Sequence, residues 1–193
     1  MRRREFLGAG LAAAALPRGR PPAVLGRRGL TAALVSDPVD HVASAPPARW
    51  ALAELGEALT GAGAVVRTAE RVADACAADL CIVAAGAEAP VAAAALARAV
   101  VVMPDTPEAL AQLVTRVSRR RVLLACGTDA RGLVYALLDL ADRVRAGPTP
   151  LASLALAHPV VERPANAVRS VMRQFTSATL DQPWLHDRES WTR

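Results

Sequence analysis

The 193-residue sequence contains no lysine and few aromatic or sulfur-containing side chains. Its three cysteines are too few for a disulfide framework and show no metal-site spacing, so we expect small core residues at Cys76, Cys81 and Cys126. No apolar run reaches the ~20 residues of a membrane-spanning helix, and we therefore expect no stable membrane anchor. With 53% apolar and 21% charged residues, the chain is also too hydrophobic for intrinsic disorder.

Positive charge is concentrated at the N-terminus. The formal net charge is +5, but seven arginines and only one acidic residue precede Thr31, whereas residues 31–193 carry 16 basic and 17 acidic side chains. A nearly neutral body gives no reason to expect a nucleic-acid partner. The three histidines, His41, His158 and His186, lie far apart in the sequence. We expect neither a metal ion nor another cofactor.

The first residues have the pattern of an export signal. A basic start and the run Arg3-Arg4-Glu5-Phe6-Leu7 lead into an apolar stretch near whose end Ala13-Ala14-Ala15 offer a cleavage site. Arg3, Arg4, Phe6 and Leu7 resemble the twin-arginine motif R-R-x-F-L. We interpret residues 1–29 as a twin-arginine signal peptide and flexible lead-in; the alternative is an ordinary amphipathic first helix. The expected partner is the twin-arginine export machinery, and the expected location is the periplasm or the extracellular space.

Residues 30–146 alternate between strand and helix patterns. Apolar or β-branched runs predict strands, and apolar residues at three- and four-residue spacing predict helices. Residues 91–102 remain ambiguous, because they begin alanine-rich and end β-branched. The predicted strands are 30–35, 64–67, 80–84, 112–117 and 121–126, the last two as a hairpin or as two adjacent strands, and the predicted helices are 50–59 and 133–145. The pattern predicts an α/β fold, a small mixed-sheet sandwich with flanking helices.

The turn from Gly127 to Gly132 has two possible roles. A strand, a glycine-rich turn and a helix N-terminus could cradle a phosphate, as in a nucleotide-binding enzyme. This turn has no lysine and places Asp129 where the anion would sit. We therefore favour Asp129 as the N-cap of the following helix. Tyr135 and the leucines of that helix are expected to cover a face of the sheet.

Two segments carry a resemblance to a known family. Residues 126–142, CGTDARGLVYALLDLAD, resemble a segment of the small α/β domain that precedes the catalytic barrel of hexosaminidase-type glycoside hydrolases (family twenty) and of α-glucuronidases. Residues 163–175 and 181–191 resemble the linker, first barrel strand and first helix start of such enzymes. The sequence departs from hexosaminidases at Arg173-Gln174, so the resemblance does not specify a hexosamine substrate.

The resemblance implies two sugar contacts near the C-terminus. By resemblance, Arg169 binds sugar hydroxyls, for which a planar guanidinium offers several fixed donors, and Trp184 forms an aromatic platform. The alternatives are that Arg169 pairs with a barrel carboxylate and that Trp184 packs at a domain junction. No catalytic residue is assigned, because Asp181, Asp187 and Glu189 fit caps or surface charges better than an acid/base pair.

The resemblance also implies the domain organisation. An accessory domain over residues 30–146 would be followed by a linker over 147–163 and by the incomplete first β/α segment of a (β/α)₈ barrel over 164–193. Such a barrel takes ~250 residues, and the family places its catalytic carboxylates on later strands. We therefore expect the N-terminal, non-catalytic portion of an exported glycoside hydrolase, with carbohydrate as its partner and no activity alone. The alternative is a free-standing periplasmic carbohydrate-binding or interaction module.

Overall fold

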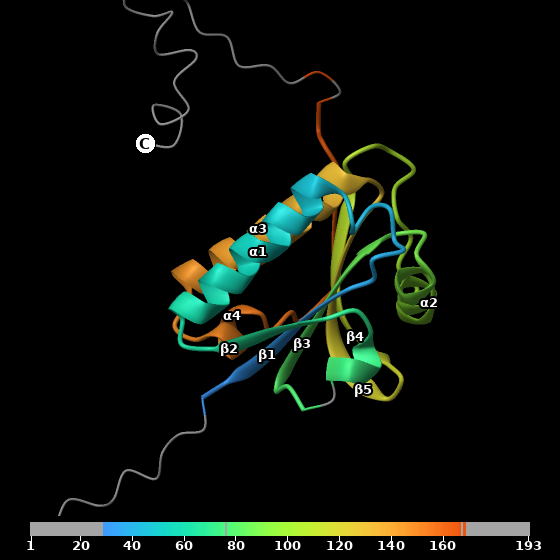
Figure 1. The fold of residues 1–193 in the computed structure, drawn as a ribbon. Coiled ribbons are helices and arrows are strands. Elements are labelled where there is room, and N and C mark those ends of the chain that lie inside the picture. Colours follow the sequence, from blue (N-terminus) through green and yellow to red (C-terminus); the bar gives the residue numbers. More distant parts are fainter. Residues whose placement is uncertain (1–28, 76, 167, 169–193) are drawn as a thin grey trace, which may run out of the picture.

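The most apolar runs of the sequence form the centre of a six-stranded mixed sheet with helices on both faces (Figure 1). The computed structural model describes residues 29–75, 77–166 and 168. The strands are β1 (Thr31–Ser36), β2 (Val65–Ala69), β3 (Leu80–Gly86), β4 (Leu110–Val117), β5 (Arg120–Gly127) and β6 (Val160–Glu162). The helices are α1 (Pro46–Gly61), the short 3₁₀ helix η1 (Val72–Ala75), α2 (Pro90–Ala99), α3 (Ala130–Ala146) and α4 (Pro150–Ser153). The predicted α/β class is confirmed.

The sheet has the strand order β2-β1-β3-β5-β4-β6. Strands β2, β1, β3 and β5 are parallel, whereas β4 runs antiparallel to both β5 and β6. The predicted hairpin is therefore confirmed as β4–β5. Its two turn residues, Ser118 and Arg119, have φ values of 49° and 66°, as a two-residue hairpin turn matching the sheet twist requires.

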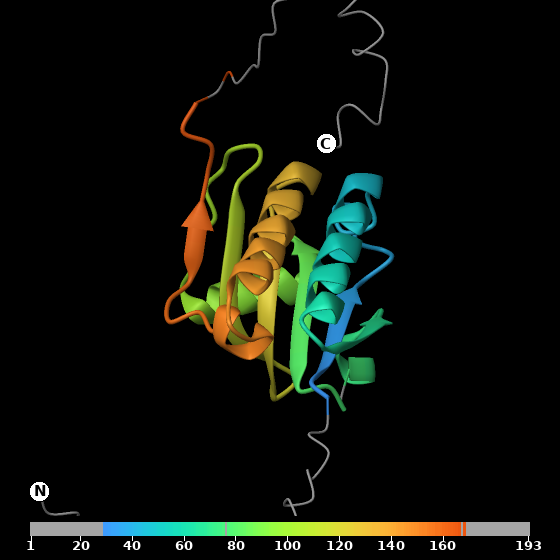
Figure 2. The ribbon, with the colours of Figure 1, turned by 90° about the vertical axis from the view of Figure 1, so that its left-hand side faces the viewer.

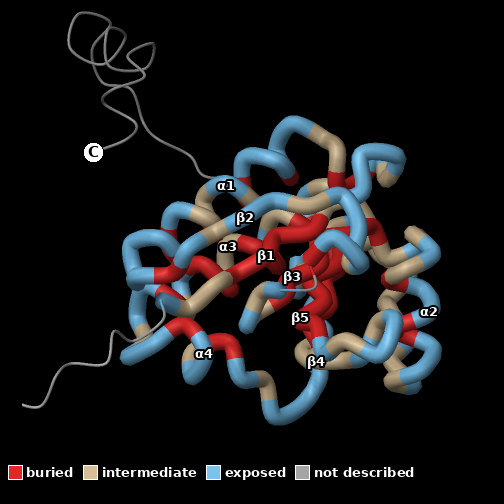
Figure 3. Tube along the Cα trace, turned by 60° about the horizontal axis from the view of Figure 1, so that its bottom comes forward, coloured by how far each residue is buried: buried red, intermediate tan, exposed pale blue. Residues whose placement is uncertain are grey.

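Each face of the sheet is covered by its own set of helices. Helices α1, α3 and α4 lie on one face, with α1 and α3 side by side, and α2 lies on the other (Figures 1 and 2). Since neighbouring side chains of a strand point to opposite faces, Leu34 packs under α1 and α3, whereas Ala33 and Val35 pack toward α2 and η1. The buried residues follow the central strands (Figure 3). The continuous apolar character of β3 is explained by this two-sided burial.

The two long helices use small residues and leucines to approach the sheet. In α1, Ala48, Ala51 and Leu55 are fully buried, whereas Trp50, which shares the apolar spacing, is 54% exposed. In α3, the predicted leucine stripe is buried, and one polar contact adds to it. The fully buried Gln112 of β4 donates from Nε2 to the carbonyl oxygen of Ala136 (2.9 Å) and to the Asp139 carboxylate (2.8 Å).

The sheet extends past residue 146, into the segment predicted as a linker. Residues 147–163 include α4 and β6, and β6 pairs with β4 through Gln112↔Val160, Ala111↔Val161 and Leu110↔Glu162. Three residues are too few to leave a recognisable strand pattern in the sequence. Pro159 directly before them is tolerated, because proline at the start of an edge strand costs no ladder hydrogen bond. The barrel segment predicted for 164–193 lies almost wholly outside the described residues.

Candidate functional site

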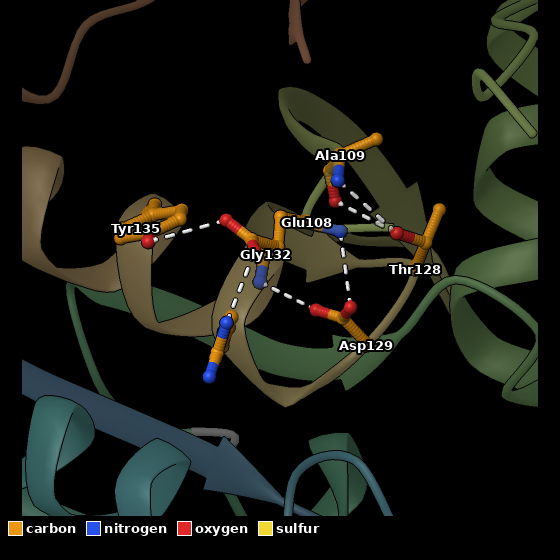
Figure 4. A network of polar contacts seen from close by, with 7 residues as sticks. Glu108, Ala109, Thr128, Asp129, Gly132 and Tyr135 are labelled. Carbon is orange, nitrogen blue, oxygen red and sulfur yellow. Dashed lines mark hydrogen bonds and ion pairs between the residues drawn. The ribbon is translucent and has the colours of Figure 1, made fainter. Parts of the chain in front are cut away.

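Asp129 joins the start of α3 to the loop before β4 (Figure 4). Its Oδ1 accepts a hydrogen bond from the backbone N–H of Gly132 (2.8 Å), which confirms the predicted N-cap. Its Oδ2 accepts from the backbone N–H of Glu108 (3.0 Å), 21 residues earlier in the chain. The carboxylate thus occupies the helix N-terminus that a bound phosphate would need, and this geometry favours capping over nucleotide binding.

Glu108 and Thr128 complete this network. Glu108 has a φ of 62°, in the left-handed region, and its carboxylate accepts from Arg131 (3.2 Å) and from the Tyr135 hydroxyl (3.3 Å) (Figure 4). Thr128 accepts at Oγ1 from the backbone N–H of Ala109 (3.1 Å). The prediction that Tyr135 covers the sheet is wrong: its side chain leans toward Glu108 and the residue is 40% exposed.

The two glycines of the turn are required by close packing. A Cβ atom at Gly127 would overlap the backbone nitrogen of Leu133, and one at Gly132 would overlap the carbonyl oxygen of Ala109. Neither glycine has a positive φ, so the requirement is space and not backbone conformation. The motif Gly127-Thr-Asp-Ala-Arg-Gly-Leu-Val-Tyr135 therefore forms a joint between β5, α3 and the loop before β4.

Two crevices open at the carboxyl ends of the parallel strands. The chain passes from β1 to α1 on one face, from β3 to α2 on the opposite face, and from β5 to α3 on the first face again. The connection after β3 leads to one face of the sheet, whereas the connections after the neighbouring strands β1 and β5 lead to the other face. The loops therefore separate on either side of β3. Crevices at such switch points are where open α/β sheets bind ligands.

A pocket occupies each of these positions. The pocket on the β1 side, about 510 Å³, is lined by residues of the β1–α1 and β3–α2 loops; the pocket on the β5 side, about 540 Å³, is lined by the β3–α2 loop and the loop before β4. We call them the carboxyl-end crevices. Three residues line both: Ala87, Glu88 and Thr128. Glu88 therefore stands on the ridge between them.

Asp40 has a structural role at the β1-side crevice. Its Oδ2 accepts from the backbone N–H of Gly86 (2.6 Å), and its Oδ1 accepts from those of Val42 (2.9 Å) and Ala43 (3.3 Å). A Cβ atom at Gly86 would lie 3.0 Å from Val42, so the end of β3 and the β1–α1 loop are held in tight contact. These contacts fix one wall of the crevice.

The crevices have an acidic rim. Asp37, Glu88 and Asp105 are exposed there, as is His41, and the described residues that line the two pockets include no arginine. Asp37 also accepts from the backbone N–H of Val39 (2.9 Å) through Oδ1. A concave surface with these charges repels phosphates and other anions and accepts hydrogen bonds from neutral or cationic groups. It gives no support to a nucleotide site.

The sugar contacts and export motif predicted from the sequence lie outside the described residues. They are Arg169 and Trp184 in the C-terminal segment and Arg3, Arg4, Phe6 and Leu7 in the N-terminal segment.

Two of the cysteines are core residues, as predicted. Cys81 and Cys126 are buried, and burial raises the pKa of the Cys126 thiol to about 12 because desolvation disfavours the thiolate. Among the described residues, no cluster of three or more histidine, cysteine or acidic side chains is arranged to hold a metal ion. None of the helices in this part of the chain has the length and apolar character needed to cross a membrane.

Sequence reasoning missed Glu108, Asp40 and Glu88. Each lies in a loop. Asp40 and Glu108 have their roles through contacts with residues distant in sequence, and Glu88 has its role through its position between the two crevices. The available signal was the position of Asp40 and Glu88 in the loops that follow apolar strands ending at Ser36 and Gly86, since carboxyl-end loops gather at one edge of a parallel sheet.

Comparisons with known proteins relate the fold to a carbohydrate-active enzyme. No protein-family model and no curated protein matches the chain. Among solved structures, it is similar to a GH138 enzyme targeting pectin rhamnogalacturonan II, with a TM-score of 0.51 and 15% sequence identity. The match covers 83% of this chain and 21% of that enzyme. At this identity the similarity concerns the fold alone: the chain has an α/β fold similar to part of a glycoside hydrolase about five times as long as the matched segment.

Proposed function

We propose that residues 29–162 form a non-catalytic accessory domain of a carbohydrate-active protein of the glycoside hydrolase type. The observation that carries the proposal is the fold similarity to a GH138 enzyme, which involves most of this chain but only 21% of that enzyme. The hexosaminidase-like motif at Gly127–Tyr135 is consistent with it, since that motif builds a packing joint.

The structural contacts of three carboxylates, those of Asp40, Glu108 and Asp129, support a non-catalytic role. Glycosidases generally use two carboxyl groups on either side of the scissile bond, one of them as a proton donor. Here Asp40 and Asp129 accept hydrogen bonds from backbone N–H groups, and Glu108 accepts from Arg131 and Tyr135. Each of these carboxylates holds loops together, so we do not assign it to acid/base chemistry.

A turnover assay tests the non-catalytic role. The whole chain is incubated with a panel of nitrophenyl glycosides and with pectic and neutral polysaccharides, and released phenol and reducing ends are measured. We expect hydrolysis rates equal to those in buffer without the protein. Hydrolysis that co-purifies with the chain and disappears in Asp40→Asn or Glu108→Gln would contradict the proposal.

We further propose that Arg169 and Trp184 contact sugar, as the resemblance implies. The test is isothermal titration of oligosaccharides into the whole chain. Arg169→Ala and Trp184→Ala should each weaken binding at least tenfold. Arg163→Ala and Trp50→Ala are matched controls, since Trp50 is an exposed tryptophan on α1. Equal effects of the test and control variants would remove the assignment.

The export prediction is retained as part of the proposal. Arg3, Arg4, Phe6 and Leu7 match the twin-arginine pattern, and we propose a periplasmic or extracellular location. Replacing both Arg3 and Arg4 by lysine should hold the precursor in the cytoplasm of a bacterial host, as measured by cell fractionation. The matched control replaces Arg18 and Arg20 by lysine. Normal export of the first variant would refute the assignment.

A further inference from the structure

We propose that the two carboxyl-end crevices form one binding site for an uncharged oligosaccharide, with Glu88 as its central contact. This inference rests on the proposed carbohydrate-related function, and it places sugar binding on the described domain itself, independently of Arg169 and Trp184. The backbone arrangement creates the crevices. The chain leaves β3 toward the face opposite to the helices that follow β1 and β5, and this opens a crevice on each side of β3.

The dimensions of the crevices favour an elongated ligand. Their volumes of about 510 and 540 Å³ each lie within the ~300–1,000 Å³ typical of small-molecule sites. They adjoin along a ridge formed by Ala87, Glu88 and Thr128, which line both. A ligand that fills both must pass over this ridge, so consecutive rings of one oligosaccharide fit the shape better than a single compact molecule.

The walls of the crevices combine hydrogen-bond acceptors with apolar surface. Sugar hydroxyls are donors, and the exposed carboxylates of Asp37, Glu88 and Asp105 would accept from them. The β1-side crevice also contains Val39, which is 86% exposed, beside Pro90 and Val91. The β5-side crevice is lined by the apolar residues Met103, Pro104 and Pro107, with the buried Leu96 beneath them. Such surfaces pack against the C–H faces of sugar rings.

The charge of the rim selects among sugars. A uronic acid would bring its carboxylate next to Glu88 and Asp37, and the described residues of the lining include no arginine to compensate it. Like charges in a concave site repel more strongly than on an open surface. The geometry therefore predicts a neutral glycan as ligand and discrimination against acidic pectic fragments.

The crevices are held open by contacts that do not involve the proposed ligand groups. Asp40 fixes the end of β3 to the β1–α1 loop through Gly86, and Ala87 donates from its backbone N–H to the carbonyl oxygen of Gly127 (2.8 Å) at the end of β5. On the other side, Asp129 holds the loop before β4. A site formed in advance loses less conformational entropy on binding.

Titration of the whole chain with two matched ligand sets tests the inference. The probes are neutral gluco-, xylo- and galacto-oligosaccharides and an oligogalacturonate of the same length. At least one neutral series should bind, the oligogalacturonate should bind at least tenfold more weakly, and Glu88→Ala should weaken neutral binding at least tenfold. Glu88→Gln should reduce the difference in affinity between neutral and acidic ligands. Glu57→Ala, on α1 outside the crevices, is the matched control, and circular dichroism verifies that each variant is folded.

The outcomes separate this inference from the proposed function. Binding that is kept in Glu88→Ala but lost in Arg169→Ala and Trp184→Ala would overturn the crevice site and leave the proposed C-terminal contacts standing. The reverse pattern would support the crevice site. If no neutral series binds, or if the oligogalacturonate binds as tightly, the crevice site is refuted, whereas the non-catalytic role still depends on the turnover assay alone.

Discussion

Replacing Asp129 tests the joint between α3 and the loop before β4. Asp129→Ala removes the N-cap of α3, which contributes about 1 kcal/mol in typical helices. It also removes the charged acceptor, 3.0 Å away, of the partly buried Glu108 N–H, and the lower end of the usual range gives about 1.5 kcal/mol for that loss. The free energy of unfolding should therefore fall by about 2.5 kcal/mol. Asp129→Asn keeps a cap oxygen but turns one acceptor into a donor, so about 1.5 kcal/mol should be lost.

Urea unfolding followed by circular dichroism measures both changes. With a denaturant slope of about 2 kcal/mol per molar, the midpoints should fall by about 1.2 M and 0.7 M, respectively. Asp142→Ala is the matched control: it removes an exposed carboxylate of the same helix that pairs with Arg145 at 3.3 Å, and it should cost less than about 0.5 kcal/mol. A loss below about 1 kcal/mol in Asp129→Ala, or an Asn variant equal to the wild type, would refute the double role of Asp129.

Three further predictions concern the glycines, the strained backbone and the buried thiols. Gly132→Ala should lower the free energy of unfolding by more than about 2 kcal/mol in the same urea assay, since its Cβ would overlap the carbonyl oxygen of Ala109 and the backbone must shift. The control is Gly61→Ala, which should not destabilise the fold because the space around Gly61 is open. Val100 is 87% exposed at the C-cap of α2 and has a φ of 54°, so Val100→Gly should raise the free energy of unfolding by about 1 kcal/mol. The same change at the exposed Val102 should lower the free energy of unfolding. Cys126 should resist alkylation in the native state and react on unfolding, as mass spectrometry can read out. Because its folded-state pKa is raised, its contribution to stability should decline as pH rises above the unfolded value of about 8.5 and level off near pH 12.

The parts of the fold that repeat a pattern were predictable from the sequence. Continuous apolar runs predicted β1, β3 and β5, and the leucine spacing predicted α3 with Asp129 as its cap. These features leave a pattern among neighbouring residues, since burial on both faces gives a continuous apolar run and an N-cap directly precedes its helix. The ambiguous residues 91–102 proved to be α2 followed by a non-helical segment, where the αL residue Val100 ends the helix.

The remaining features depend on contacts between distant segments. β6 is visible only through its partner β4, and Glu108 acquires its role from Asp129, Arg131 and Tyr135. The crevices depend on which face each helix covers, which no local pattern records. Tyr135 shows the opposite error, since it was expected to cover the sheet but its position on α3 leaves it exposed.

The pairing of β6 with β4 has a consequence for where this domain can be cut. A chain ending at residue 146 would keep every long helix and strand, yet the backbone of Leu110–Gln112 would lose its hydrogen-bonding partner. An unpaired stretch on an apolar edge strand is a template for strands of other molecules. We therefore expect a version of the domain that ends at residue 146 to self-associate more readily than one that keeps Val160–Glu162.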